Sequence, residues 1–130
     1  MARTSVTTQK ITRAGLAAAA TAPAGLGAAN GDVVDSGNTA LEVICGATGT
    51  TVTVEVPVMI DGLTVGPLVV VCPANTTTKI GPFTGTFKQT AASVAANAPN
   101  NSAVPTADVG RVYVDYSVSI ATVTRSAVSF

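Results

Sequence analysis

The chain has 130 residues, of which 47% are hydrophobic and only 11% are charged. Its 7 basic and 7 acidic residues give a formal net charge of zero, which argues against nucleic-acid binding because such binding depends on a basic excess. No histidine is present, so a Cys–His nucleophile is excluded. The length fits one domain with a thin core of small side chains, because aromatic residues make up only 4%.

Residues 1–30 are rich in Ala, Thr and Gly and show no amphipathic stripe, which predicts an extended N-terminal arm rather than a helix. Its basic residues Arg3, Lys10 and Arg13 are either solvated or in contact with an acidic protein surface or nucleic acid. The sequence Ala20–Ala22 resembles a signal-peptide cleavage site, but the apolar stretch before it is weak. No run is long enough for a membrane helix.

Four strands separated by Gly, Pro and Asn turns are expected in the first half of the domain that begins at residue 31. They are Thr39–Cys45, Thr50–Val58, Leu63–Cys72 with a break at Gly66-Pro67, and Thr76–Ile80. In the second strand Val52, Val54 and Val56 alternate with polar residues and are expected to face the core. The run Leu68–Val71 is apolar throughout, which predicts burial on both faces.

The C-terminal half is predicted to contain a long loop and one further strand. Phe83 is expected to fill the core, and Gln89–Asp108, which has no period and many turn residues, is expected to form an exposed loop. The last strand is predicted over Arg111–Val123, with Val112 and Val114 facing the core. The pattern as a whole predicts an all-β fold over residues 31–130, a small antiparallel β-sandwich or barrel.

The residues that carry chemistry are few and scattered. Asp32 and Asp35 are best explained as turn residues, and Glu42 and Glu55 as solvated charges on outward strand positions. Cys45 and Cys72 each lie in an apolar strand. They are expected either to be buried free thiols or, if their strands are adjacent, to form one disulfide bridge. Tyr113 and Tyr116 either pack or stack on a sugar. We therefore expect no catalytic residues, no metal and no cofactor, and a structural or binding protein rather than an enzyme.

Four stretches resemble a family of small virion proteins of tailed phages and prophages. They are ITRAGL (11–16), SGNTALEV (36–43), the segment from Thr51 to Phe83 that ends in IGPF, and RVYVDYS (111–117). The resemblance as a whole extends over about two thirds of the chain. Two departures stand out: Gln89–Asp108 is an insertion relative to the family, and Asn75 stands where a turn glycine is common. Asn tolerates the left-handed backbone conformation, so the second change is mild.

The resemblance implies a capsid decoration, or cement, protein that binds the outside of the phage head and stabilises the shell. Its partner would be the major capsid protein, it would self-associate, with a trimer as the expected state, and it would be found on the virion after synthesis in the bacterial cytoplasm. Neither a nucleic acid nor a membrane is expected as a partner. The N-terminal arm would contact the shell through Arg3, Lys10, Ile11, Arg13 and Leu16.

Three alternatives remain open from the sequence. A head–tail connector or tail component would assemble as a ring or tube. A carbohydrate-binding surface module would use the loop Ala96–Pro105. A secreted bacterial surface protein would require the weak signal peptide to be real.

Overall fold

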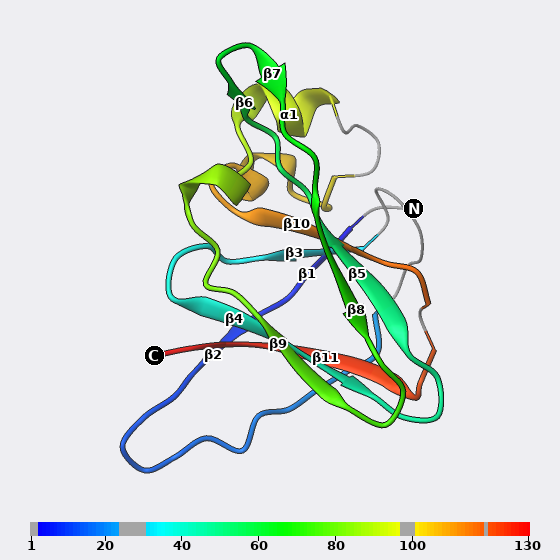
Figure 1. The fold of residues 1–130 in the computed structure, drawn as a ribbon. Helices are drawn as coiled ribbons and strands as arrows, with labels where there is room; N and C mark the ends of the chain where they lie inside the picture. The colour runs from blue at the N-terminus through cyan, green and yellow to red at the C-terminus, as the bar shows by residue number, and fades with distance from the viewer. Residues whose placement is uncertain (1–2, 24–30, 97–100, 119) are drawn as a thin grey trace.

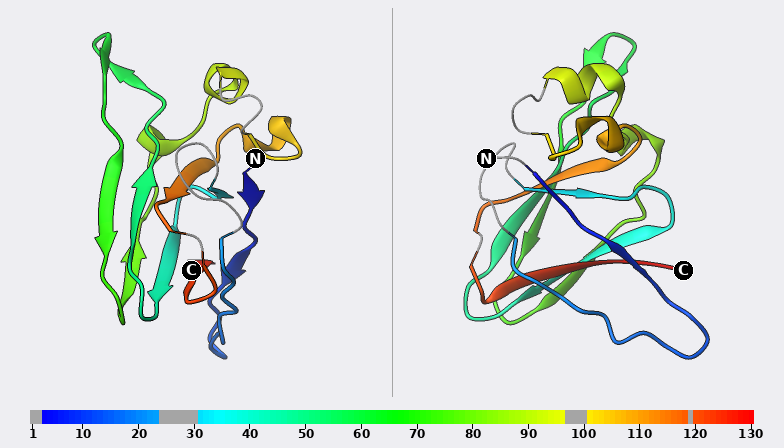
Figure 2. Two further views of the ribbon diagram at one scale, coloured as in Figure 1. Left: turned by 90° about the vertical axis from the view of Figure 1, so that its right-hand side faces the viewer. Right: turned by 180° about the vertical axis from the view of Figure 1, so that it is seen from behind.

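The computed structural model describes residues 3–23, 31–96, 101–118 and 120–130. Two β-sheets lie face to face with an apolar core between them, as Figures 1 and 2 show. The first sheet has five strands in the order β1-β3-β10-β5-β8, and the second has four in the order β2-β11-β4-β9. Neither sheet closes on itself, so the fold is a sandwich rather than a barrel, and the predicted all-β class is confirmed.

The first sheet contains β1 (Thr4–Ser5), β3 (Asp32–Val34), β10 (Val112–Tyr116), β5 (Thr50–Val54) and β8 (Leu68–Cys72). The second contains β2 (Thr8–Lys10), β11 (Val123–Ser129), β4 (Thr39–Cys45) and β9 (Thr77–Ile80). A separate hairpin joins β6 (Met59–Ile60) to β7 (Leu63–Thr64). The helical elements are α1 (Ala91–Ala96) and the 3-10 turns η1 (Gly85–Phe87) and η2 (Pro105–Asp108). Within the described ranges, no helix has the length and apolar character that crossing a membrane demands.

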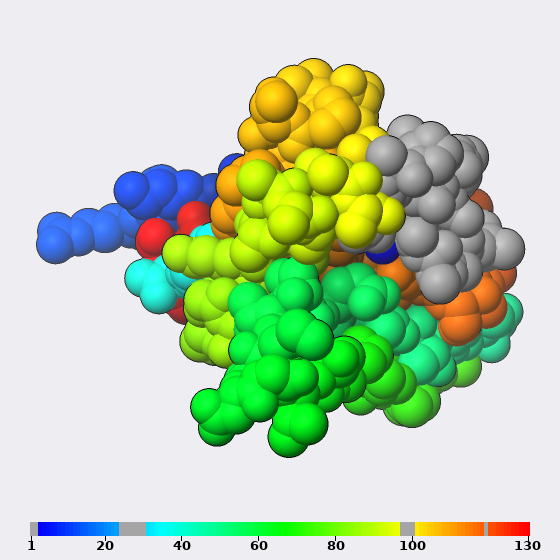
Figure 3. Space-filling view, turned by 90° about the horizontal axis from the view of Figure 1, so that it is seen from above, coloured from blue at the N-terminus to red at the C-terminus, as the bar shows by residue number. Residues whose placement is uncertain are grey.

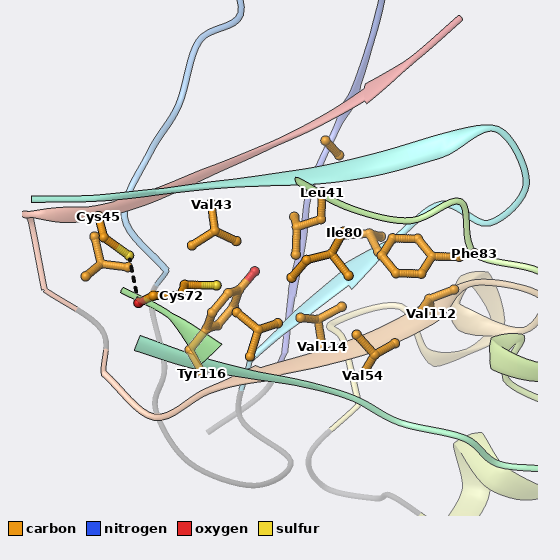
Figure 4. Close-up of a cluster of buried hydrophobic side chains, with 14 residues drawn as sticks. Leu41, Val43, Cys45, Val54, Cys72, Ile80, Phe83, Val112, Val114 and Tyr116 are labelled. Atoms are coloured by element: carbon orange, nitrogen blue, oxygen red, sulfur yellow. Dashed lines mark hydrogen bonds between the residues drawn. The ribbon is translucent and has the colours of Figure 1, made fainter. Parts of the chain in front are cut away.

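Side chains from both sheets meet in the core (Figure 4). The predicted core residues Val52, Val54, Phe83, Val112 and Val114 are all at most 1% exposed. Val56 is only half-buried, and its prediction as a core residue is wrong. The cause is that β5 ends at Val54 instead of Val58, near Pro57, which cannot donate a ladder hydrogen bond.

Strand β8 is the clearest departure from the expected burial. The prediction that Leu68–Val71 is buried on both faces is wrong, because β8 is the outermost strand of the first sheet. Val69 and Val71 are 56% and 69% exposed, and Val70 is only partly buried against the core. A continuous apolar run is therefore present at a sheet edge instead of in the sheet centre.

The C-terminal residues form two strands where the sequence predicts one. β10 ends at Tyr116 in the first sheet, and β11 lies in the second sheet. Core-facing residues are even-numbered in β10, such as Val114, but odd-numbered in β11, such as Val123 and Ala127. Because a shift of one residue moves a side chain to the other face of a strand, this change of phase marks the crossing between the sheets.

The N-terminal segment belongs to both sheets. β1 pairs in parallel with β3, and β2 pairs in parallel with β11, so the segment runs along one side of the sandwich (Figure 2, blue). Residues 3–10 are therefore integrated into the domain, and the predicted separation of a 1–30 arm from a 31–130 domain does not hold for them. Residues 11–19 are exposed and project as a loop, which returns at Thr21 to pair with Arg125.

The insertion Gln89–Asp108 folds back against the first sheet. Val94 of α1 packs with Val33 and Tyr113 in a second small cluster, and Gln89 and Asp108 are buried. Figure 3 shows this end of the molecule, where the yellow α1 lies beside the green β6–β7 hairpin. The expectation of a wholly exposed loop is therefore wrong, because the outer face of β10 needs this cover; residues 97–100 lie outside the described ranges.

Candidate interaction surfaces

The first surface of interest is apolar and lies on the long ribbon that β5–β8 and the β6–β7 hairpin form. We call it the ribbon surface; it consists of Met59, Ile60, Leu63, Leu68, Val69 and Val71, which are 39% to 72% exposed. The hairpin turns at Asp61 and Gly62, whose positive φ angles of 50° and 75° suit the Asp-Gly pair that the sequence predicts as a turn. The hairpin pairs Ile60 with Leu63, both of which are exposed, and its backbone projects beyond the two sheets (Figure 1).

The ribbon surface is almost free of charge. Between Glu55 and Lys79 the sequence contains a single charged residue, Asp61. Exposed edge strands in natural proteins usually carry charges or other features that prevent pairing with a second chain. β8 carries no charged residue, and Pro67 and Pro73 flank it directly at its two ends. An uncharged edge of this kind can be covered by another protein with little cost of desolvation.

The second surface lies on the projecting loop 11–19, at the end of the sandwich opposite the β6–β7 hairpin. We call it the loop surface; Ile11, Leu16 and Phe130 are its exposed apolar side chains. They border a groove of about 280 Å³ on the outer side of the second sheet, with Glu42 and Lys79 also in its lining. An apolar groove with one acidic and one basic residue at its side fits a protein partner better than a small charged ligand.

Hydrogen bonds hold the projecting loop at its base and at its tip. The Gln9 side-chain amide donates to the Ala19 carbonyl at 2.8 Å, and the Ala19 backbone N–H donates to Gln9 Oε1 at 2.9 Å. The Ile11 N–H donates to the Ser129 carbonyl at 2.7 Å, and Gly15 closes a turn with Thr12 at a φ of +89°. These contacts give the loop a defined shape although its side chains are exposed.

Four of the five residues predicted to contact a shell are exposed on or beside this loop. They are Lys10, Ile11, Arg13 and Leu16. Arg3 is not available for such a contact, because it is 97% buried within its own domain, with 3% of its surface exposed. Its inclusion among the shell-contacting residues is therefore wrong: the guanidinium faces inward because an acidic partner lies beneath it.

That partner is Asp115 on the outer face of β10. Arg3 Nη2 donates to both carboxylate oxygens, at 3.0 and 3.1 Å, and the guanidinium carbon lies 4.1 Å from the centre of the Tyr113 ring. Nearby, burial raises the pKa of Glu55 to about 7, with a hydrogen bond and the negative charge of Asp115 adding to the effect. Gly31 packs so tightly here that a Cβ atom would lie 1.9 Å from the Val114 carbonyl oxygen.

A second buried ion pair joins the two sheets. Arg125 of β11 donates to both oxygens of Asp32 in β3, at 2.6 and 3.0 Å, and Tyr116 Oη donates to Asp32 Oδ2 at 2.8 Å. The expectation that Asp32 is a turn residue is therefore wrong. Burial raises the pKa of Tyr116, and the negative charge of Asp32 raises it further. Arg125 also donates to the Thr21 carbonyl at 3.1 Å, which ties the returning N-terminal segment to the same pair.

The insertion is fixed by a buried carboxylate at its end. Asp108 accepts hydrogen bonds from the Tyr113 hydroxyl at 2.8 Å and from the Ser102 backbone N–H at 2.9 Å. Burial and this contact raise the pKa of Tyr113. Both tyrosine rings are buried, so neither is presented for stacking on a sugar, and Asn101 and Ser102 of the expected glycan loop are buried as well.

The two cysteines lie close together without a bridge. Cys45 and Cys72 are both buried and free, and Cys45 Sγ contacts the Cys72 carbonyl oxygen at 3.7 Å (Figure 4). Burial raises the pKa of the Cys72 thiol, which favours the unreactive protonated form. Within the described part of the chain, no group of three His, Cys, Asp or Glu side chains is placed to hold a metal ion.

The residues that sequence analysis missed are the acidic and basic partners inside the strands. Asp115 lies on the outer face of β10, where a solvated charge is expected, and it is buried because Arg3 of the N-terminal segment pairs with it. Arg125 lies beyond the predicted last strand, on the core-facing side of β11, where it pairs with Asp32. The available signal was the scarcity of charged residues in this chain, because a charged residue within a strand of such a chain is expected to have a partner.

Comparisons with protein-family models, curated proteins and solved structures found no match.

Proposed function

We propose that this chain is a structural virion protein that decorates the outside of a phage head and stabilises the shell by binding the major capsid protein. The loop surface supports the proposal most directly. Ile11 and Leu16, the first and last residues of the ITRAGL stretch, are 36% and 39% exposed beside an apolar groove. The motif that opens the family resemblance is thus the part of the segment whose side chains are free to bind.

The arrangement of the two surfaces suits a clamp. The loop surface lies at one end of the sandwich, and the β6–β7 hairpin of the ribbon surface lies at the other (Figure 1), so the loop can bind the shell while the ribbon surface binds a second partner. The apolar core and the buried Arg125–Asp32 ion pair hold together the two sheets that carry these surfaces. A clamp of this kind acts through binding energy alone, and many copies on one shell add up through multivalency.

The first test is the number of copies per virion. Mass spectrometry of purified virions should find the chain in a simple ratio to the major capsid protein. A far smaller number of copies would indicate a head–tail connector or a tail component instead. Absence from virions would contradict both virion roles.

The second test locates the contact. The double variant I11D/L16D should lose binding to shells that lack the protein, because it places two charges in an apolar contact. V104D is the matched control, since Val104 is 59% exposed and lies far from the loop in the sequence. Equal binding by I11D/L16D and the parent chain, with both folded, would show that the loop surface is not the shell contact.

A further inference from the structure

We propose that the edge of β8 binds a second copy of this chain across a two-fold axis, through antiparallel pairing centred on Val70. The inference concerns the chain by itself and does not depend on what the chain decorates. It starts from the topology: β8 pairs with β5 along one edge, and nothing in the described ranges pairs with the other (Figure 2). A free edge carries unpaired backbone N–H and C=O groups that a second strand can satisfy.

The sequence of the strand favours a second copy as the occupant. Read in either direction from Val70, β8 is apolar, with Val69 and Val71 on either side and Leu68 and Cys72 at the ends. Antiparallel pairing about Val70 places Val69 of each copy opposite Val71 of the other. These two residues are 56% and 69% exposed, so four exposed valines would form one apolar cluster on the outer face.

Charge gives a second argument for a copy of the same chain. In a two-fold contact the same patch meets itself, so a charged residue near the axis meets a like charge. β8 itself carries no charge. Asp61 lies at the tip of the hairpin, beyond β7 and Pro67, and Glu55 follows the neighbouring strand β5, away from the free edge, and is half-buried. Pro67 and Pro73 directly flank the strand and limit the pairing to its five residues, which fixes the register.

The exposed apolar area of the ribbon surface approaches the area that each partner buries in a stable pair. The exposed parts of the six side chains of the ribbon surface amount to roughly 600 Å². A standard interface buries about 800 Å² on each partner, so a dimer of standard size has to cover the hairpin side chains beside β8 as well as the edge of β8 itself. The same area left uncovered would be a large apolar patch for a monomeric protein.

Sedimentation of the full chain tests the inference without any capsid protein. The parent chain should be a dimer at concentrations up to about 100 µM, in place of the trimer that the family resemblance implies. V69K and V71K should each weaken association at least about tenfold. V104K introduces the same change at a similarly exposed valine outside the ribbon and should leave the dimer intact. A monomeric or trimeric parent chain, or equal weakening by V104K and V69K, would overturn the proposal.

Cross-linking tests the register. A mixture of tagged V69C and untagged V71C chains should form a disulfide between the two, well above the background of the native thiols in the unsubstituted chain. V69C alone should cross-link less, because Val69 does not face its own copy in the proposed register. A higher yield for V69C alone would exclude pairing about Val70. Since shell binding is measured separately with I11D/L16D, failure of the dimer leaves the proposed function standing.

Discussion

Replacing Arg3 with methionine tests whether the N-terminal segment is part of the folded domain. The change removes the guanidinium that donates to both oxygens of Asp115 at 3.0 and 3.1 Å. Methionine keeps much of the apolar stem that lies over Tyr113. The carboxylate of Asp115, whose side chain is 5% exposed, then retains the Gly31 N–H at 3.2 Å as its backbone donor.

The cost follows from burial of the unpaired charge. Removing one partner of a buried ion pair destabilises a protein by about 3–5 kcal/mol. Loss of the contact between the Arg3 cation and the Tyr113 ring adds up to about 1 kcal/mol. We expect R3M to lower the free energy of unfolding by about 3 kcal/mol, which corresponds to a fall in the unfolding temperature of about 10 °C. The value is at the lower end of the range because the Gly31 N–H still donates a hydrogen bond to Asp115.

Urea unfolding followed by circular dichroism measures the effect, since the chain has no tryptophan for fluorescence. The pair is isolated by D115N and by R3M/D115N. Because each single variant already breaks the pair, the double variant should cost at least about 1.5 kcal/mol less than the sum of the two. Arg13 is exposed on the projecting loop, so R13M should change stability by less than about 0.5 kcal/mol. Equal stability of R3M and the parent chain, or additive effects, would refute the reasoning.

Two further predictions concern strand β5 and the residue that follows it. V54D should prevent folding because it places a charge at a fully buried position, and circular dichroism would show this as loss of the strand signal. The control T51D, at a half-buried position on the outward face of the same strand, should still fold. Burial and Asp115 raise the pKa of Glu55 from 4.5 to about 7, so the folded state binds this proton more tightly than the unfolded state. The contribution of Glu55 to stability is therefore fully present below about pH 4.5 and is lost as the pH rises through about 7. E55Q should reduce the difference in stability between about pH 5 and pH 8, and an unchanged difference would contradict this role for Glu55.

The sequence predicts the sheet fold well because alternation and turn residues are local signals. β4 lies at Thr39–Cys45 as expected, the turn at Asp61-Gly62 is present, and Asn75 has the left-handed φ of 59° that its place in the turn suggests. These features depend on residues near one another in the chain. The same local patterns also identify the valines of β5 and β10 that fill the core.

The sequence fails where burial depends on segments that are distant in the chain. The local sequence predicts that Arg3 is a solvated charge. It is buried in the structure because β1, which follows it, pairs with β3, and β3 in turn pairs with β10. Leu68–Val71 is a buried strand by composition, and it is exposed because no other strand in the described ranges lies beyond β8. Periodicity gives the faces of a strand but not its neighbours, so sheet order was the missing information.

The motifs that carry the family resemblance also differ in whether their side chains are buried in the fold or exposed. The IGPF and VDYS stretches contribute Phe83 and Tyr116 to the core and Asp115 to a buried ion pair, so these residues serve the fold. A chain with this sandwich would need them whatever it binds. ITRAGL is different, because its side chains are exposed on the projecting loop and the fold gives them no burial. Of these motifs, it is therefore the one whose substitution separates binding from folding, and I11D/L16D should lose shell binding while keeping the parent's unfolding temperature.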